Sequence, residues 1–219
     1  MTDAATRLHI VRDNIARAAK LARRDPGAVT LIAVSKRRSA AEIEALIAEG
    51  VTDFGENRVV EVAEKWPALR TAHPQVRLHM IGQLQSNKAD EAVALFDTIH
   101  SLDRPSLLTA LVAAAERAGR VPQVYVQVNI GDEDQKGGVA LGELEKFVET
   151  VRASYGKGLM GLMAMPPKGL EPGPYFALLA KLARRHDVAG LSMGMSSDYE
   201  TAVMLGATAV RVGSALFED

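Results

Sequence analysis

The sequence lacks cysteine and is poor in aromatic residues, and both deficits exclude classes of function. Without cysteine the chain has no disulfide, no thiolate nucleophile and no cysteine-ligated metal. Aromatic residues make up only 5% of the 219 residues and the formal net charge is −1, so base-stacking surface is scarce and there is no basic field to attract phosphate backbones. Nucleic acid is therefore not an expected partner.

Long apolar runs are also missing. Segments such as residues 123–130 are short and interrupted by polar residues, whereas a helix needs roughly 20 apolar residues to cross a bilayer. The polar start MTDAATRLHI lacks the charged-then-apolar layout of a secretory signal. We therefore expect a cytoplasmic protein without membrane contact. No linker, low-complexity tract or charge block divides the chain, which favours one domain over residues 1–219.

Short β-rich runs alternate with helical ones along almost the whole sequence. Apolar residues at three- and four-residue spacing predict a first helix over about residues 2–24. Eight strands are then expected at 29–35, 51–55, 76–82, 98–101, 122–130, 158–164, 189–194 and 208–213. Helices are expected between them at 40–49, 58–69, 88–95, 105–118, 141–152, 175–185 and 197–205, with a long loop at 166–174.

This repeat predicts an α/β fold, a single (β/α)8 TIM-type barrel preceded by an N-terminal helix. Parallel strands require crossover connections of this kind. An open doubly wound sheet also fits the alternation, but the first strand is not followed by GxGxxG and eight strands suit closure better.

The residues that close each strand are the candidate functional residues, because sites in such barrels lie at the C-terminal strand ends. The rule selects Lys36, Asn57, Arg211, Gly213 and Ser214. Alternation along LIAVSK places Lys36 at the rim on the same, inward face as the apolar strand positions before it. A lysine at a strand end more often extends to solvent than reacts, so its position alone decides nothing.

The chemistry of lysine also suits Lys36 to a role as a nucleophile. A desolvated lysine beside other cations, here Arg37 and Arg38, is a nucleophilic amine that can form an imine with an aldehyde. Gly213 and Ser214 lead into a turn whose N–H groups can hold a phosphate. The seventh strand ends in SMGMSSD, where Ser196 or Ser197 can supply a hydroxyl or merely cap a helix. Two loops thus converge on one anion.

Six motifs occur in order along the chain: VSK at 34–36, FGEN at 54–57, IGQLQSNK at 81–88, LMGLM at 159–163, SMGMS at 192–196 and RVG at 211–213. Together they resemble the YggS/PROSC family of pyridoxal 5′-phosphate (PLP) homeostasis proteins, over about residues 31–217. The resemblance implies a PLP-loaded barrel similar to the N-terminal domain of alanine racemase. The sequence departs from the family pattern at Gln83, where many relatives carry histidine, and at Ser214, where threonine is frequent.

The resemblance also implies roles for individual residues. Lys36 matches the lysine that forms the aldimine with PLP, and Asn57 matches a residue that lines the pocket. Arg211 matches an arginine that faces the pyridine nitrogen. The phosphate-holding positions are matched by Ser196, Gly213 and Ser214. No catalytic residue is assigned, and the implied function is that of a carrier or regulator of PLP with apo PLP-dependent enzymes as partners.

Two other functions stay open at this stage. A PLP-dependent amino-acid racemase would need a second acid/base group, and none of the four tyrosines has a spacing that singles it out. An aldolase would use Lys36 on a sugar phosphate without PLP. Arg211 suits either racemisation with limited quinonoid build-up or mere retention of PLP, because a protonated guanidinium keeps the ring nitrogen neutral and the ring a poorer electron sink. The absence of heptads and of a large apolar stripe favours a monomer.

Overall fold

A computed structural model describes residues 3–133 and 135–217. Its eight parallel strands form a closed barrel in sequence order, which confirms the predicted fold class. The strands are β1 (Thr30–Val34), β2 (Asp53–Glu56), β3 (Arg77–Met80), β4 (Thr98–Leu102), β5 (Gln123–Gln127), β6 (Leu159–Met163), β7 (Gly190–Ser192) and β8 (Ala209–Val212).

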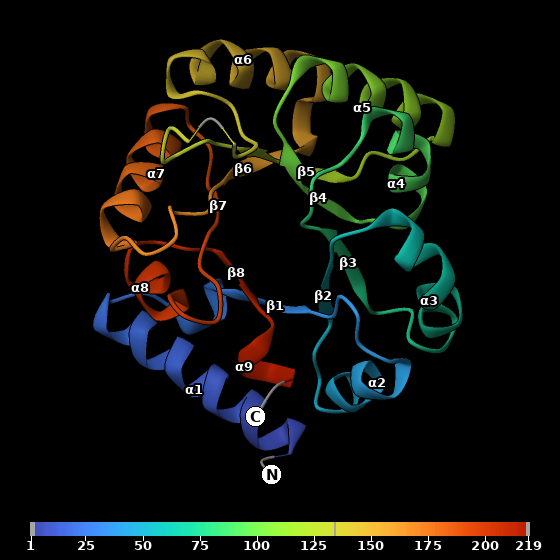
Figure 1. The fold of residues 1–219 in the computed structure, drawn as a ribbon, viewed down its shortest axis with the longest axis vertical. Coiled ribbons are helices and arrows are strands. Elements are labelled where there is room, and N and C mark those ends of the chain that lie inside the picture. The colour runs from blue at the N-terminus through green and yellow to red at the C-terminus, as the bar shows by residue number, and fades with distance from the viewer. Residues whose placement is uncertain (1–2, 134, 218–219) are drawn as a thin grey trace.

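Helices surround the strands on the outside (Figure 1). They are α1 (Ala4–Leu21), α2 (Ala40–Ala48), α3 (Val59–Ala72), α4 (Ala89–Leu95), α5 (Pro105–Ala118), α6 (Leu144–Tyr155), α7 (Gly173–Arg185), α8 (Tyr199–Met204) and α9 (Ser214–Phe217). Short 3₁₀ turns lie at Pro26–Ala28, Ser86–Lys88, Leu141–Glu143 and Gly156–Gly158. No helix of the described residues is both long and apolar enough to span a membrane.

Several predicted boundaries were wrong by a few residues. The first helix begins at Ala4, because the Asp3 side chain accepts the Thr6 N–H as an N-cap; Thr2 lies outside the described residues. Helix α7 begins at Gly173, within the predicted loop, because Pro174 is well suited to the first helical turn. The short α9 was not predicted.

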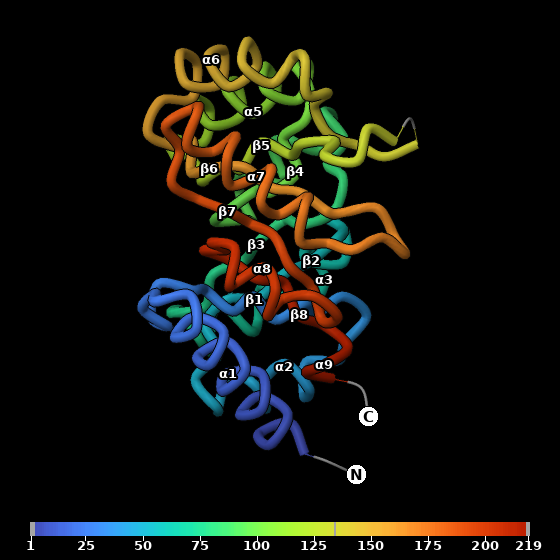
Figure 2. The backbone as a smooth tube through the Cα atoms, turned by 90° about the vertical axis from the view of Figure 1, so that its left-hand side faces the viewer, coloured from blue at the N-terminus to red at the C-terminus, as the bar shows by residue number. Residues whose placement is uncertain are grey.

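Helix α1 covers the seam at which the barrel closes. Its apolar residues Leu8, Val11, Ile15, Ala18 and Ala19 are buried. It lies beside α8 and α9, as Figures 1 and 2 show. Beyond its end, Arg24 donates to the carbonyl oxygens of Val203 at 2.6 Å and Ala207 at 2.8 Å. The start of the chain is thereby tied to the segment between β7 and β8.

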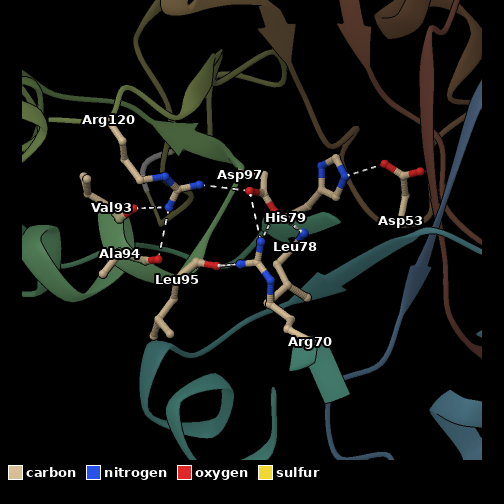
Figure 3. Close-up of polar contacts among 9 residues, drawn as sticks. All are labelled: Asp53, Arg70, Leu78, His79, Val93, Ala94, Leu95, Asp97 and Arg120. Atoms are coloured by element: carbon tan, nitrogen blue, oxygen red, sulfur yellow. Dashed lines mark hydrogen bonds and ion pairs between the residues drawn. The ribbon is translucent and has the colours of Figure 1, made fainter. Parts of the chain in front are cut away.

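Two carboxylates organise the N-terminal end of the barrel (Figure 3). Asp97, just before β4, accepts hydrogen bonds from the Leu78 N–H at 2.8 Å and from Arg120 at 2.9 Å, and it pairs with Arg70 at 3.3 Å. Both arginines also donate to carbonyl oxygens at the end of α4. Asp97 therefore joins a strand to the packing of three helices.

The second carboxylate, Asp53, is buried at the start of β2. Its two oxygens accept hydrogen bonds from His79 at 2.9 Å, Arg77 at 2.8 Å and Thr52 at 2.7 Å. Burial acts to raise the pKa of Asp53, but the hydrogen bonds outweigh it and lower the pKa to about 2. The folded protein thus favours the ionised form.

We predict that Asp97→Ala lowers the free energy of unfolding by about 2–3 kcal/mol, because three donors, two of them charged, lose their acceptor. Asp90→Ala is the matched control, since its pair with Arg117 is exposed and should contribute at most about 1 kcal/mol. Urea denaturation measures both. Equal losses for the two variants would contradict the assigned role of Asp97.

Acid should remove the contribution of Asp53. A carboxylate with a depressed pKa stabilises the fold above its unfolded pKa and loses that contribution as the pH falls through the folded pKa. The advantage of the wild type over Asp53→Asn should therefore shrink by on the order of 2 kcal/mol between about pH 5 and pH 2. Chemical denaturation across this range measures the difference, and a pH-independent difference would contradict the prediction.

Candidate functional site

A cleft of about 590 Å³ opens at the C-terminal ends of the strands. All six residues selected from the sequence line it, although they come from four separate segments of the chain. They are Lys36 after β1, Asn57 after β2, Ser196 after β7, Arg211 within β8, and Gly213 and Ser214 after β8. The structure therefore brings together every residue that was proposed to share a site.

Lys36 lies at the rim of this cleft, as alternation along β1 predicts. Ile32 is fully buried and Val34 lines the cleft together with Lys36. The expectation of a desolvated amine was wrong, because Lys36 is an exposed residue. The neighbouring Arg38 is occupied elsewhere, with its guanidinium 5.1 Å from the Phe217 ring centroid and 3.4 Å from Glu42.

The backbone next to Lys36 is held in an unusual conformation. Arg37 has a φ of 60°, in the left-handed region that non-glycine residues rarely adopt. Its N–H donates to Glu61 of α3 at 2.6 Å, and Lys65 of the same helix donates to the Ser35 carbonyl oxygen at 3.0 Å. Helix α3 therefore holds the turn that presents Lys36.

Beneath that turn lies a buried carboxylate, Glu56, at the end of β2. One of its oxygens accepts hydrogen bonds from the Ser35 hydroxyl at 2.8 Å and the Trp66 indole at 3.0 Å, and lies 2.7 Å from the Lys65 ammonium. The other oxygen is buried without a hydrogen-bond partner among the described residues. Because burying a carboxylate costs free energy unless it is paired, Lys65 is essential to this arrangement.

The side of the cleft formed by the β7 and β8 loops is rich in hydrogen-bond donors. The Ser196 hydroxyl oxygen accepts from the N–H groups of Gly213 at 3.1 Å and Ala215 at 3.4 Å, which leaves its own proton free to be donated. Gly194 has a φ of +94°, and a Cβ there would lie 2.6 Å from that of Ala202. A larger residue would displace the loop that carries Ser196.

Arg211 is the one buried cation among the described residues that line the cleft. Its side chain donates to the Ser192 hydroxyl at 2.5 Å and to the Ala164 carbonyl oxygen at 3.2 Å. Burial lowers the pKa of Arg211 to about 10, so the guanidinium still carries its charge at neutral pH. The cleft therefore offers a fixed positive charge on one wall and a solvent-accessible amine on another.

Sequence reasoning missed two further kinds of residue. Gln127 lines the cleft and accepts from Gln83 at 3.1 Å while donating to the Gly137 carbonyl oxygen at 3.0 Å, so it fastens the loop after β5. That loop and the one after β6 project from the same side of the barrel in Figure 2. His79 and His100 lie inside the barrel, and alternation along their strands was the available signal.

Comparison with known proteins places the chain in a family. The family model described as "Alanine racemase, N-terminal domain" matches residues 7–219. The pyridoxal phosphate homeostasis protein of Pseudomonas aeruginosa is 38% identical over 223 residues, covering 99% of this chain and 96% of the relative. That of Escherichia coli K12 is 36% identical over 228 residues, covering 99% and 97%. The chain belongs to the pyridoxal phosphate homeostasis protein family.

Solved structures of similar proteins agree with this membership. PipY of Synechococcus elongatus PCC7942 with PLP bound is 38% identical, with a TM-score of 0.81 and coverage of 93% of this chain and 99% of that one. A protein from Bifidobacterium adolescentis is 31% identical with a TM-score of 0.88, covering 98% and 94%. Alanine racemase from Corynebacterium glutamicum is 20% identical with a TM-score of 0.63, and the match covers 94% of this chain and 59% of the racemase. That last likeness shows the barrel fold.

For the Glu56 cluster of this family member we predict that Lys65→Met lowers the free energy of unfolding by about 3 kcal/mol, because it leaves a buried carboxylate unpaired. Adding Glu56→Gln should restore part of the loss. Lys88→Met is the control, since it breaks an exposed pair with Glu91 and should cost at most about 1 kcal/mol. Denaturant titrations measure all four proteins. A Lys65→Met loss no larger than that of Lys88→Met would refute the assigned pairing.

Proposed function

We propose that the protein holds PLP covalently through Lys36 and acts in intracellular PLP homeostasis as a carrier or regulator of the cofactor. The observation that carries this proposal is that all six residues matched to PLP-binding positions line one cleft. PipY, 38% identical to this chain, has been solved with PLP bound. Delivery of PLP to apo-enzymes that depend on it is part of the proposal.

The residues of the cleft suit the chemistry of PLP. A volume of about 590 Å³ falls in the usual range for small-molecule sites. PLP presents an aldehyde, a pyridine ring and an anionic phosphate. The exposed amine of Lys36 is accessible to the aldehyde, and the donors around Ser196 are suited to the phosphate. Bound PLP would supply an electrophilic carbon and an electron-accepting ring.

Each residue then has a distinct role. Ser196, Gly213 and Ser214 would hold the phosphate with hydroxyl and N–H groups. Asn57 lines the ring, and its backbone is tightly packed, since a Cβ at Gly82 would lie 2.4 Å from the Asn57 carbonyl oxygen. Arg211 would hold the pyridine nitrogen, and its charge would disfavour protonation of that nitrogen. A neutral ring nitrogen makes PLP a weaker electron sink, which favours retention over catalysis.

The lining of the cleft also favours a carrier over an amino-acid racemase. Racemisation needs acid/base groups on both faces of the substrate carbon. Among the described residues that line the cleft there is neither a tyrosine nor a histidine. Tyr125 stacks on His100 inside the barrel, with ring centroids 4.6 Å apart, and the Tyr199 hydroxyl accepts from Asn14 of α1 at 2.9 Å. Neither tyrosine lies at the site.

The anchor is tested by absorption spectroscopy of the protein loaded with PLP. We expect a visible band in the wild type, which borohydride reduction should fix to the peptide containing Lys36, and loss of both signals in Lys36→Ala. Lys157→Ala is the matched control, because Lys157 is exposed in the turn before β6, at the opposite end of the barrel. A wild type without the band, or attachment at another lysine, would refute covalent binding through Lys36.

Amino-acid turnover separates the alternatives. We expect no robust racemisation of L- or D-amino acids by the loaded protein, measured by chiral chromatography. Robust turnover that Lys36→Ala abolishes would overturn the carrier proposal in favour of a racemase. Imine trapping by a sugar phosphate in protein free of PLP would instead indicate an aldolase.

A further inference from the structure

A chain of polar side chains crosses the interior of the barrel beneath the cleft. Arg211 of β8 contacts the Ser192 hydroxyl of β7 at 2.5 Å, and that hydroxyl lies 2.8 Å from Nδ1 of His100 on β4. Nε2 of His100 lies 3.0 Å from Nδ1 of His79 on β3, and Nε2 of His79 lies 2.9 Å from Asp53 of β2. We refer to these five residues as the barrel relay.

The barrel relay runs from one end of the barrel to the other. Asp53 lies at the N-terminal end, where its second oxygen accepts from Arg77, whose side chain is 60% exposed. Arg211 lies at the opposite end, in the lining of the cleft. All five members are buried. The cleft is therefore connected by direct hydrogen bonds to the far mouth of the barrel.

The two ends fix the direction of the first and the last hydrogen bond in the relay. A guanidinium can only donate and a carboxylate can only accept. Arg211 must then donate to Ser192, and every other member is satisfied with neutral rings when the Ser192 hydroxyl donates to Nδ1 of His100. Nε2–H of His100 donates to Nδ1 of His79, and Nε2–H of His79 donates to Asp53. In this arrangement both imidazoles are neutral and carry their proton on Nε2.

The reverse direction is unfavourable for two reasons. It would place a proton on Nδ1 of both histidines, which makes His79 a second cation inside the barrel. It would also turn the Ser192 hydroxyl away from His100, and the described residues give it no other acceptor. Burial is the largest cause that lowers the pKa of His100 well below its ordinary value, in agreement with a neutral ring. Tyr125 stacks on that ring.

We propose that Ser192, His100 and His79 are positioning residues that hold Arg211 in place for the pyridine ring of PLP through this fixed direction of hydrogen bonds. The inference rests on the proposed function. Arg211 is otherwise bonded at its side chain to one backbone carbonyl oxygen, that of Ala164, among the described residues. Without the relay, one guanidinium nitrogen would lose its acceptor and the side chain would be free to turn. His100 and His79 thus help to set the orientation of Arg211 without contacting it.

The first test needs no PLP. Nitrogen-15 NMR of histidine-labelled, PLP-free protein reports which ring nitrogen of His79 and His100 carries the proton. Single His79→Gln and His100→Gln variants assign the signals. We expect both rings to be neutral with the proton on Nε2. A doubly protonated His79, or a proton on Nδ1 of His100, would overturn the assigned direction whether or not the protein binds PLP.

The second test measures the dissociation constant for PLP and the position of its absorption band. Ser192→Ala and His100→Leu should each weaken binding roughly tenfold and shift the band, since a hydrogen bond to a charged group contributes about 1.5–3 kcal/mol and 1.4 kcal/mol is tenfold. His100→Gln should bind nearly as well as the wild type, because its amide can accept and donate. Ser101→Ala is the matched control, since Ser101 is buried on β4 and its hydroxyl has no described partner.

An Arg211→Gln background separates positioning from a general structural effect. If the relay acts through Arg211, adding His100→Leu to Arg211→Gln should weaken PLP binding no further. Additive losses, or a Ser192→Ala affinity equal to that of Ser101→Ala, would overturn the proposal. A wild type that binds no PLP would overturn the proposed function and with it the role of the relay toward PLP, whereas the NMR test would still decide the direction of the hydrogen bonds.

Discussion

The pairing of β1 with β8 is the constraint on which the rest of this structure depends. It aligns Ile32 with Arg211 and Ala33 with Val212, so that the two ends of the chain form adjacent strands. Lys36, which follows β1, and Gly213, which follows β8, are therefore brought to the same rim of the barrel, although more than 170 positions separate them in the sequence. Helix α1 covers this seam, and Arg7 adds a 2.8 Å hydrogen bond to the carbonyl oxygen of Leu216 in α9. The N-terminal helix is thus part of what assembles the site.

The polar interior of this barrel follows from the functional site that the barrel carries. Barrel interiors are commonly filled by layers of branched apolar side chains. Here Asp53, His79, His100, Ser192 and Arg211 occupy interior positions, and each must satisfy its neighbour because an unpaired polar group in a dry interior is costly. Such a network limits the number of arrangements the interior can adopt. We attribute its presence to the need to fix one cation in the lining of the cleft.

The sequence predicted the secondary-structure elements and the residues at the rim of the barrel far better than it predicted the side-chain contacts. Period-2 alternation and crossover spacing are local properties, so the eight strands and Lys36 could be found from them. The relay could not be derived in this way, because it joins residues on five strands whose register is set only when the barrel closes. Likewise, the positive φ of Arg37 depends on Glu61, 24 positions away on α3. A local pattern contains no information on that pairing, and it likewise gave the wrong expectation that Lys36 is desolvated.

The two buried polar systems fix Arg211 and Lys36 by different means, and this difference suits the proposed function. Arg211 is held from within the barrel by a network of buried side chains. Lys36 is held from outside, by α3 acting on its backbone through Glu61 and Lys65, while its side chain stays exposed. A carrier must orient its cargo firmly and yet leave the covalent bond open to attack by an incoming amine. Rigid recognition of the ring combined with an accessible lysine meets both requirements, whereas a catalyst of amino-acid chemistry would be expected to enclose the reacting bond and exclude water from it.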